Sequence, residues 1–133
     1  MKDYLNLRLS DEQMKTTGTL GLAYVGDAVY ELLVRAWLCE RGSAAPVNLH
    51  REAVRYVSAP AQAAAAAQIM EKLSAEELAL FKRGRNAKVN TVPKSADTAD
   101  YHAATGLEAL FGWLYMKGET ERINEIFEYI AEG

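Results

Sequence analysis

The sequence predicts an all-α protein that forms a single domain. Its 133 residues are the size of one ordinary domain, and half of them are hydrophobic, which is enough for a substantial core. Sustained alternation of apolar and polar residues, the pattern of a half-buried strand, is not found. Two segments, residues 20–32 and 103–116, are instead almost wholly apolar over helical lengths. We expect both to be core helices of one domain that spans residues 1–133.

Capping residues place the N-terminal elements. An irregular arm, residues 1–10, precedes a first helical turn that Ser10 can cap. Thr17 or Thr19 can cap the long helix that follows, which we expect to run to Glu40.

Three shorter helices are predicted in the middle of the chain. The first covers residues 47–57, where apolar residues recur at helical spacing. Ser58 can cap an alanine-rich helix over residues 61–73, because alanine strongly favours helix. Ser74 and Glu77 have the spacing of a capping box, which predicts the start of the next helix.

The segment 82–94 differs from the rest of the chain, because it is basic and contains no acid. Its basic residues are Lys82, Arg83, Arg85, Lys88 and Lys94. We expect an exposed loop whose side chains can bind phosphates. The alternative is a solvated loop without a ligand. Since the net charge of the chain is −3, any basic surface must be local.

The C-terminal part of the chain predicts two further helices. Residues 95–100 lead into the apolar helix that carries Glu108, and Lys117 with the glycine after it ends that helix. The last helix is amphipathic. Its apolar residues are Ile123, Ile126, Phe127 and Ile130.

Each of the two apolar helices carries one acid near its middle, Asp27 in the first and Glu108 in the second. A carboxylate is rarely buried without a partner. Gly26 and Gly112 lie close to these acids, and glycine inside a helix costs up to about 1 kcal/mol, which close approach of two backbones can offset. If the helices cross there, the two acids converge, and Mg²⁺ would relieve their repulsion. The alternative is that an arginine or lysine from elsewhere pairs with each acid.

Other polar residues give weaker signals. Glu31 continues the face of Asp27 and is either an outer partner of the metal site or part of a salt bridge with Arg35.

Cys39 is the single cysteine, so it excludes an internal disulfide and fits a reducing compartment. The N-terminus lacks a signal-peptide pattern and no apolar run has the length of a membrane span, so we expect a cytoplasmic protein.

These motifs resemble a known family. Residues 22–31 resemble the signature helix of the ribonuclease III domain, and residues 107–112 resemble its second acidic motif. Residues 82–88 and 91–94 are similar to the Mini-III ribonucleases, the short bacterial branch without a double-stranded-RNA-binding domain. The resemblance covers nearly the whole chain.

The resemblance implies a homodimeric, Mg²⁺-dependent endoribonuclease that cleaves double-stranded RNA and matures the ends of the large-subunit (23S) ribosomal RNA precursor. Asp27 and Glu108 match two of the four carboxylates of the family's metal site, while Ala23 and Thr105 stand where larger ribonuclease III enzymes have acids. Thr105 is therefore, with Glu31, a candidate for the outer shell of the site. A ribosomal protein that assists cleavage is a further candidate partner.

Two other functions remain open from the sequence. The first is a non-catalytic RNA- or ribosome-binding module that has lost two metal ligands. The second is a metal-dependent hydrolase of small nucleotides. Retention of both Asp27 and Glu108 disfavours the first, and the extended basic segment disfavours the second.

Overall fold

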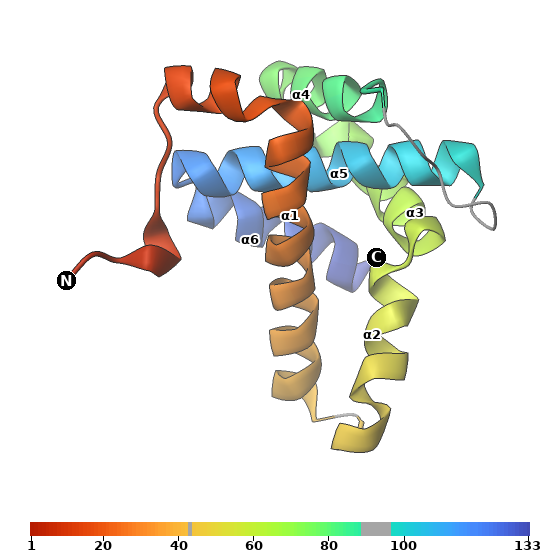
Figure 1. Cartoon of the computed structure of the whole chain (residues 1–133). Helices are drawn as coiled ribbons and strands as arrows, with labels where there is room; N and C mark the ends of the chain where they lie inside the picture. The colour runs from red at the N-terminus through yellow and green to blue at the C-terminus, as the bar shows by residue number, and fades with distance from the viewer. Residues whose placement is uncertain (43, 89–96) are drawn as a thin grey trace.

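The computed structural model describes residues 1–42, 44–88 and 97–133, and within these ranges every regular element is a helix (Figure 1). This confirms the all-α prediction. The α-helices are α1 (Asp11–Arg41), α2 (Leu49–Val57), α3 (Ala59–Ile69), α4 (Ala75–Arg85), α5 (Thr98–Lys117) and α6 (Thr120–Glu132). Three short 3₁₀ helices connect them, namely η1 (Tyr4–Asn6), η2 (Pro46–Asn48) and η3 (Met70–Lys72).

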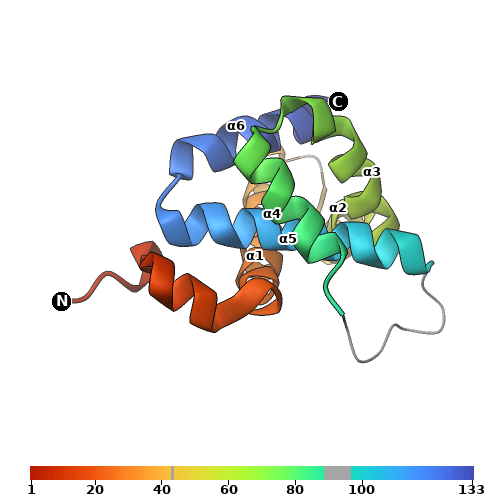
Figure 2. The ribbon, with the colours of Figure 1, turned by 90° about the horizontal axis from the view of Figure 1, so that it is seen from above.

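Helix α5 lies at the centre of the fold. It crosses α1 and also packs against α3, α4 and α6 (Figures 1 and 2). Its inward side chains Leu107, Leu110 and Phe111 are completely buried. The ring of Tyr30 from α1 packs edge-on against Phe111, with 5.3 Å between ring centroids. The two apolar segments of the sequence are thus the two helices that form most of the core.

The caps predicted at Ser10, Ser58 and Ser74 are present. The Ser10 hydroxyl accepts a hydrogen bond from the backbone N–H of Gln13, and the Ser74 hydroxyl accepts one from the backbone N–H of Glu77. In both cases the side chain of the later residue accepts a hydrogen bond from the backbone N–H of the serine, which completes a capping box. The long helix α1 is interrupted at Gly18, whose φ of 74° is left-handed. The helix start predicted at Thr17 or Thr19 lies beside this break, but α1 already begins at Asp11 and its cap is Ser10.

The prediction of a loop over residues 82–94 is wrong for its first part, because α4 continues through Arg85. Gly84 is buried against α5, where an added Cβ would lie 2.9 Å from the Cα atom of Gly106. The glycine therefore permits close helix packing and does not end the helix. Residues 89–96, including Lys94, lie outside the described residues.

Burial of α1 on every side is also contradicted. Tyr24 and Leu32 are 83% and 65% exposed, and Asp27 is exposed as well. The reason is that α5, α4 and α2 cover only part of the circumference of α1. An apolar surface on α1 therefore remains uncovered in the single chain.

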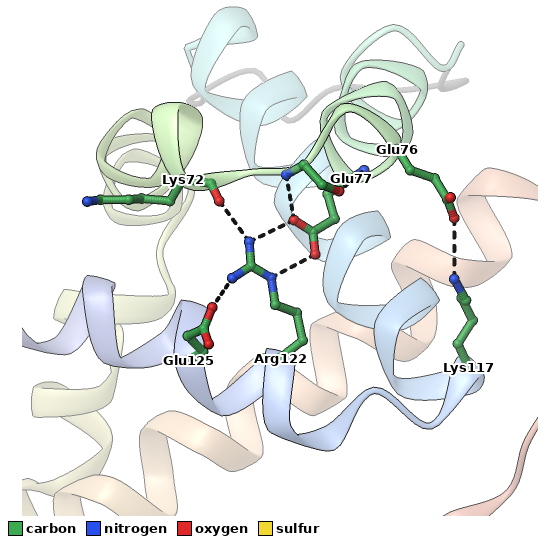
Figure 3. Close-up of polar contacts among 7 residues, drawn as sticks. Lys72, Glu76, Glu77, Lys117, Arg122 and Glu125 are labelled. Atoms are coloured by element: carbon green, nitrogen blue, oxygen red, sulfur yellow. Dashed lines mark hydrogen bonds and ion pairs between the residues drawn. The ribbon is translucent and has the colours of Figure 1, made fainter.

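An ion-pair cluster joins α6 to η3 and α4 (Figure 3). The Arg122 guanidinium donates two hydrogen bonds of 2.8 Å to the buried Glu77 carboxylate and one of 2.7 Å to the Lys72 carbonyl. Arg122 also pairs with Glu125. Hydrogen bonding to Arg122 outweighs burial and lowers the pKa of Glu77. The cluster holds the start of α4 against α6.

Candidate active site

The site is built where α1 and α5 touch through glycine. A Cβ atom on Gly26 would collide with the backbone carbonyl of Glu108, and one on Gly112 would collide with the carbonyl of Leu22. The close approach expected from these two glycines is therefore present. It brings the backbone around Asp27 against the turn of α5 that carries Glu108.

Asp27 and Glu108 line the same pocket, which has a volume of about 270 Å³. Its wall is completed by residues from α2, α3 and α5. These are Val57, Ala59, Gln62, Tyr101, Ala104 and Thr105. The convergence of the two acids, which the sequence predicts, is thus found in the fold.

The Glu108 carboxyl is perturbed by its surroundings in the pocket. Burial raises the pKa of Glu108 to about 8, and the negative charge of Asp27 together with a hydrogen bond between the two carboxyls adds to the increase. A hydrogen-bonding contact from the Gln62 amide acts in the opposite direction. Without a cation, the Glu108 carboxyl therefore binds its proton more tightly than an exposed glutamate does. No lysine or arginine lines this pocket, which excludes the simple pairing alternative for the described residues.

The donor set of the pocket fits Mg²⁺. Magnesium takes oxygen ligands and usually retains several waters, so one or two carboxylates are sufficient. Among the described residues, no three or more His, Cys, Asp or Glu side chains lie close enough together to bind a metal ion as a group. The side-chain oxygen of Gln62 is also buried and without a hydrogen-bond partner in the described structure. The pocket is thus rich in oxygen and incompletely satisfied.

The two predicted outer residues have different positions. Thr105 lines the pocket and is 7% exposed, and its hydroxyl donates a hydrogen bond of 3.0 Å to the Tyr101 carbonyl. Glu31 does not line the pocket; it pairs with Arg35 at 2.8 Å on the surface of α1. Of the two readings of Glu31 from the sequence, the structure favours the salt bridge.

Gln62 is the residue of the pocket that sequence reasoning missed. It is 2% exposed and lies in α3, where most of its neighbours are alanines. A polar side chain on the buried face of an alanine-rich helix was the available signal. The sequence does not show which face of that helix is buried, so the signal is weak.

The basic residues lie at the end of α4 and just beyond it. Lys82, Arg83, Arg85 and Lys88 are all exposed. Gly84 among them packs against α5, where its added Cβ would lie 3.1 Å from the carbonyl oxygen of Thr105. The basic end of α4 therefore adjoins the turn of α5 that lines the pocket, and Figure 2 shows α4 lying across α5.

Within the ranges that the structure describes, no helix combines the length and the apolar character needed to cross a membrane.

Comparison with known proteins places this chain in a family. The model of the Ribonuclease III domain matches residues 20–119. The Mini-ribonuclease 3 of Symbiobacterium thermophilum is 50% identical over 117 residues, which cover 88% of this chain and 90% of the relative. The Mini-ribonuclease 3 of Clostridium tetani is 39% identical, with coverage of 97% and 86%. A crystal structure of a Fusobacterium nucleatum protein superimposes with a TM-score of 0.81 at 28% identity, covering 90% of this chain and 98% of that one. The chain therefore belongs to the ribonuclease III family, in its Mini-ribonuclease 3 group, and is an endoribonuclease.

Proposed function

We propose that this endoribonuclease cleaves double-stranded RNA in a Mg²⁺-dependent reaction, with Asp27 and Glu108 as the metal-binding and catalytic residues. The observation that carries the proposal is the convergence of these two acids in one pocket at the glycine contact of α1 and α5. Burial and the nearby charge of Asp27 together raise the pKa of Glu108, which supports a cation as the missing partner.

Each residue then has a defined task. Asp27 and Glu108 would hold Mg²⁺, and the bound ion would supply an activated water and charge stabilisation at the phosphate. Asp27 is exposed, so a large substrate can reach it. Thr105 commits its hydroxyl proton to the Tyr101 carbonyl and fixes the turn of α5 below Glu108.

The exposed basic residues at the end of α4 support an RNA substrate. Proteins recognise A-form RNA mainly by its shape, its phosphates and its 2′-hydroxyls, which suits a basic surface that reads no bases. Lys82, Arg83, Arg85 and Lys88, with Lys94 from the sequence, would contact the phosphates. A small nucleotide would not need contacts so far beyond the pocket, so we favour a duplex.

Membership of the Mini-ribonuclease 3 group suggests the biological substrate. We infer that the chain matures the ends of the 23S ribosomal RNA precursor in the cytoplasm and that a ribosomal protein could assist by shaping this RNA. The non-catalytic RNA- or ribosome-binding module that the sequence left open does not agree with membership of this group of endoribonucleases or with both acids in the pocket.

The uncovered apolar surface of α1 supports a homodimer. A shallow, mainly apolar pocket borders Asp27 on this surface. Its lining residues are Leu5, Tyr24, Val25, Ala28, Val29, Leu32 and Tyr115. A second copy of the chain would bury this surface, whose lining includes Asp27. Two sites would then be available for the two strands of a duplex.

Cleavage of labelled duplex RNA tests the proposed chemistry. We expect cleavage to require Mg²⁺ and to fall by about 10³-fold or more in Asp27→Asn and in Glu108→Gln, because a metal site supplies several kcal/mol of transition-state stabilisation. Glu31→Gln is the matched control, since it removes a nearby acid outside the pocket. Full cleavage in EDTA, or by either pocket variant, would overturn the assignment.

A further inference from the structure

Gln62 is a buried amide that the proposed chemistry does not use. Its Nε2 group donates a hydrogen bond of 3.0 Å to the backbone carbonyl of Val57 at the end of α2. This contact fixes which end of the amide is nitrogen and which is oxygen. Because Val57 and Gln62 both line the pocket, the amide is anchored to the part of the wall that α2 and α3 form.

The same side chain has unused hydrogen-bonding capacity. Its Oε1 atom is buried and has no partner among the described residues. A buried polar atom without a partner costs free energy, and an apolar residue would avoid that cost in an alanine-rich helix. Packing therefore does not explain a glutamine at this position.

The position of the amide relative to the acids indicates its role. Glu108 and Gln62 line the same pocket, and a contact from the amide N–H group of Gln62 favours the charged form of the Glu108 carboxyl. We propose that Gln62 is a positioning residue, which holds the Glu108 carboxylate in the orientation that lets it share one divalent ion with Asp27. Groups that orient metal ligands in this way commonly change metal affinity or activity by about 10- to 100-fold when removed.

This role also accounts for a site with only two carboxylates. Ala23 and Thr105 offer no charge, so the orientation of the two remaining acids matters more. Gln62 reaches the pocket from α3, which packs against α5 on a different side from α1. The amide thus connects a third helix to the site. The inference rests on the proposed metal site and goes beyond it by naming the residue that orients one of its ligands.

Binding of Mn²⁺ to the metal-free protein, measured by titration and competed with Mg²⁺, tests the proposal without any cleavage. We expect Gln62→Met, which keeps the volume of the side chain, to weaken Mn²⁺ binding about 10-fold or more. Gln68→Met is the matched control on the exposed face of α3 and should bind as the wild type does. Affinity for duplex RNA in the absence of metal should be unchanged in both variants, and raised Mg²⁺ should restore cleavage by Gln62→Met.

The outcomes separate the two proposals. If the wild type itself binds no Mn²⁺ that Mg²⁺ can displace, the proposed metal site fails. If the wild type and Gln62→Met bind Mn²⁺ equally, only the role of Gln62 fails. Thermal unfolding identifies a variant that does not fold; in that case Gln62→Asn is used, whose shorter amide cannot reach both Val57 and Glu108. Wild-type Mn²⁺ affinity in folded Gln62→Asn would likewise overturn the inference.

Discussion

The backbone of Gly26 in α1 lies directly against the backbone carbonyl of Glu108 in α5, with no room for a side chain between them. This contact sets the distance between the two helices and, through it, the position of both acids. Because the atoms that an added Cβ would meet belong to backbone, they cannot move aside without separating the helices.

Gly26→Ala is therefore expected to destabilise the fold by at least about 1–3 kcal/mol, the usual range for overpacking, and to reduce metal-dependent cleavage in the fraction that folds. Denaturant unfolding measures the first effect. Gly21→Ala on the same helix is the control. Its Cβ would lie 2.6 Å from a Thr17 methyl group, which can rotate away, so its effect should stay near or below about 1 kcal/mol. Equal effects from the two substitutions would contradict the role of the contact.

The raised pKa of Glu108 predicts how the stability of the metal-free protein depends on pH. The ordinary pKa is 4.5 and the folded value is about 8, so the folded state binds the proton more tightly than the unfolded state. The stabilisation from this group is fully present below about pH 4.5 and is lost as the pH rises through about 8. Mg²⁺ must displace this proton, so its affinity should rise over the same interval.

Urea unfolding of the metal-free protein between pH 5 and pH 8.5 measures this slope. Glu108→Gln should flatten the profile, because the amide does not titrate, while Glu31→Gln should leave it unchanged. A profile that is the same for wild type and Glu108→Gln would show that the carboxyl pair does not hold a proton.

The sequence predicted more of the site than of its surroundings. Asp27 and Glu108 stood out because each is an isolated charge in an apolar helix, and charge in an apolar segment is a local signal. The loop predicted from residue 82 onward is wrong up to Arg85, because Gly84 packs against Gly106 of another helix, and a contact between segments so distant in the sequence leaves no periodic pattern. Gln62 was not predicted either, because a glutamine among alanines is informative only when the buried face of that helix is known.

Removing Arg122 from its ion pair with Glu77 is expected to lower the free energy of unfolding strongly. The Glu77 side chain is 8% exposed and that of Arg122 is 23% exposed. Arg122→Met would leave the carboxylate buried without its partner, which typically costs about 3–5 kcal/mol. Thermal or denaturant unfolding measures the loss. Glu125→Gln removes the exposed partner of the same arginine and should cost no more than about 1 kcal/mol. A loss of that small size for Arg122→Met would show that the cluster does not hold α4 against α6.

The exposed apolar surface of α1 predicts that a charge placed there dissociates the proposed homodimer. Tyr24→Glu and Leu32→Glu should each convert the protein to a monomer at micromolar concentration, because a carboxylate buried in an apolar interface has no partner. Val47→Glu is the matched control, since Val47 is 87% exposed but lies on η2 at the far end of α1. Light scattering reports the mass. A wild-type protein that is monomeric, yet cleaves duplex RNA, would refute the dimer.

The last prediction concerns the basic end of α4. Replacing Arg83, Arg85 and Lys88 together by alanine should weaken binding of duplex RNA much more than it slows cleavage of bound RNA. Phosphate contacts release counterions, so the affinity should fall steeply with salt, and each lost contact should flatten that dependence by about one unit. Asp27 and Glu108 are unchanged in this variant, so the single-turnover rate at saturating RNA should stay close to that of the wild type.

A control variant with the same change of charge distinguishes phosphate contacts at the end of α4 from a general effect of the charge of the protein. Lys15, Arg41 and Lys72 are exposed and lie on other elements, so their combined replacement by alanine should alter the salt dependence much less. The rival role for the basic end is to position the scissile phosphate, which its packing beside Thr105 also permits. An unchanged salt dependence with a collapsed single-turnover rate would favour positioning over binding. If neither quantity changes, these side chains are a solvated surface with no part in the reaction.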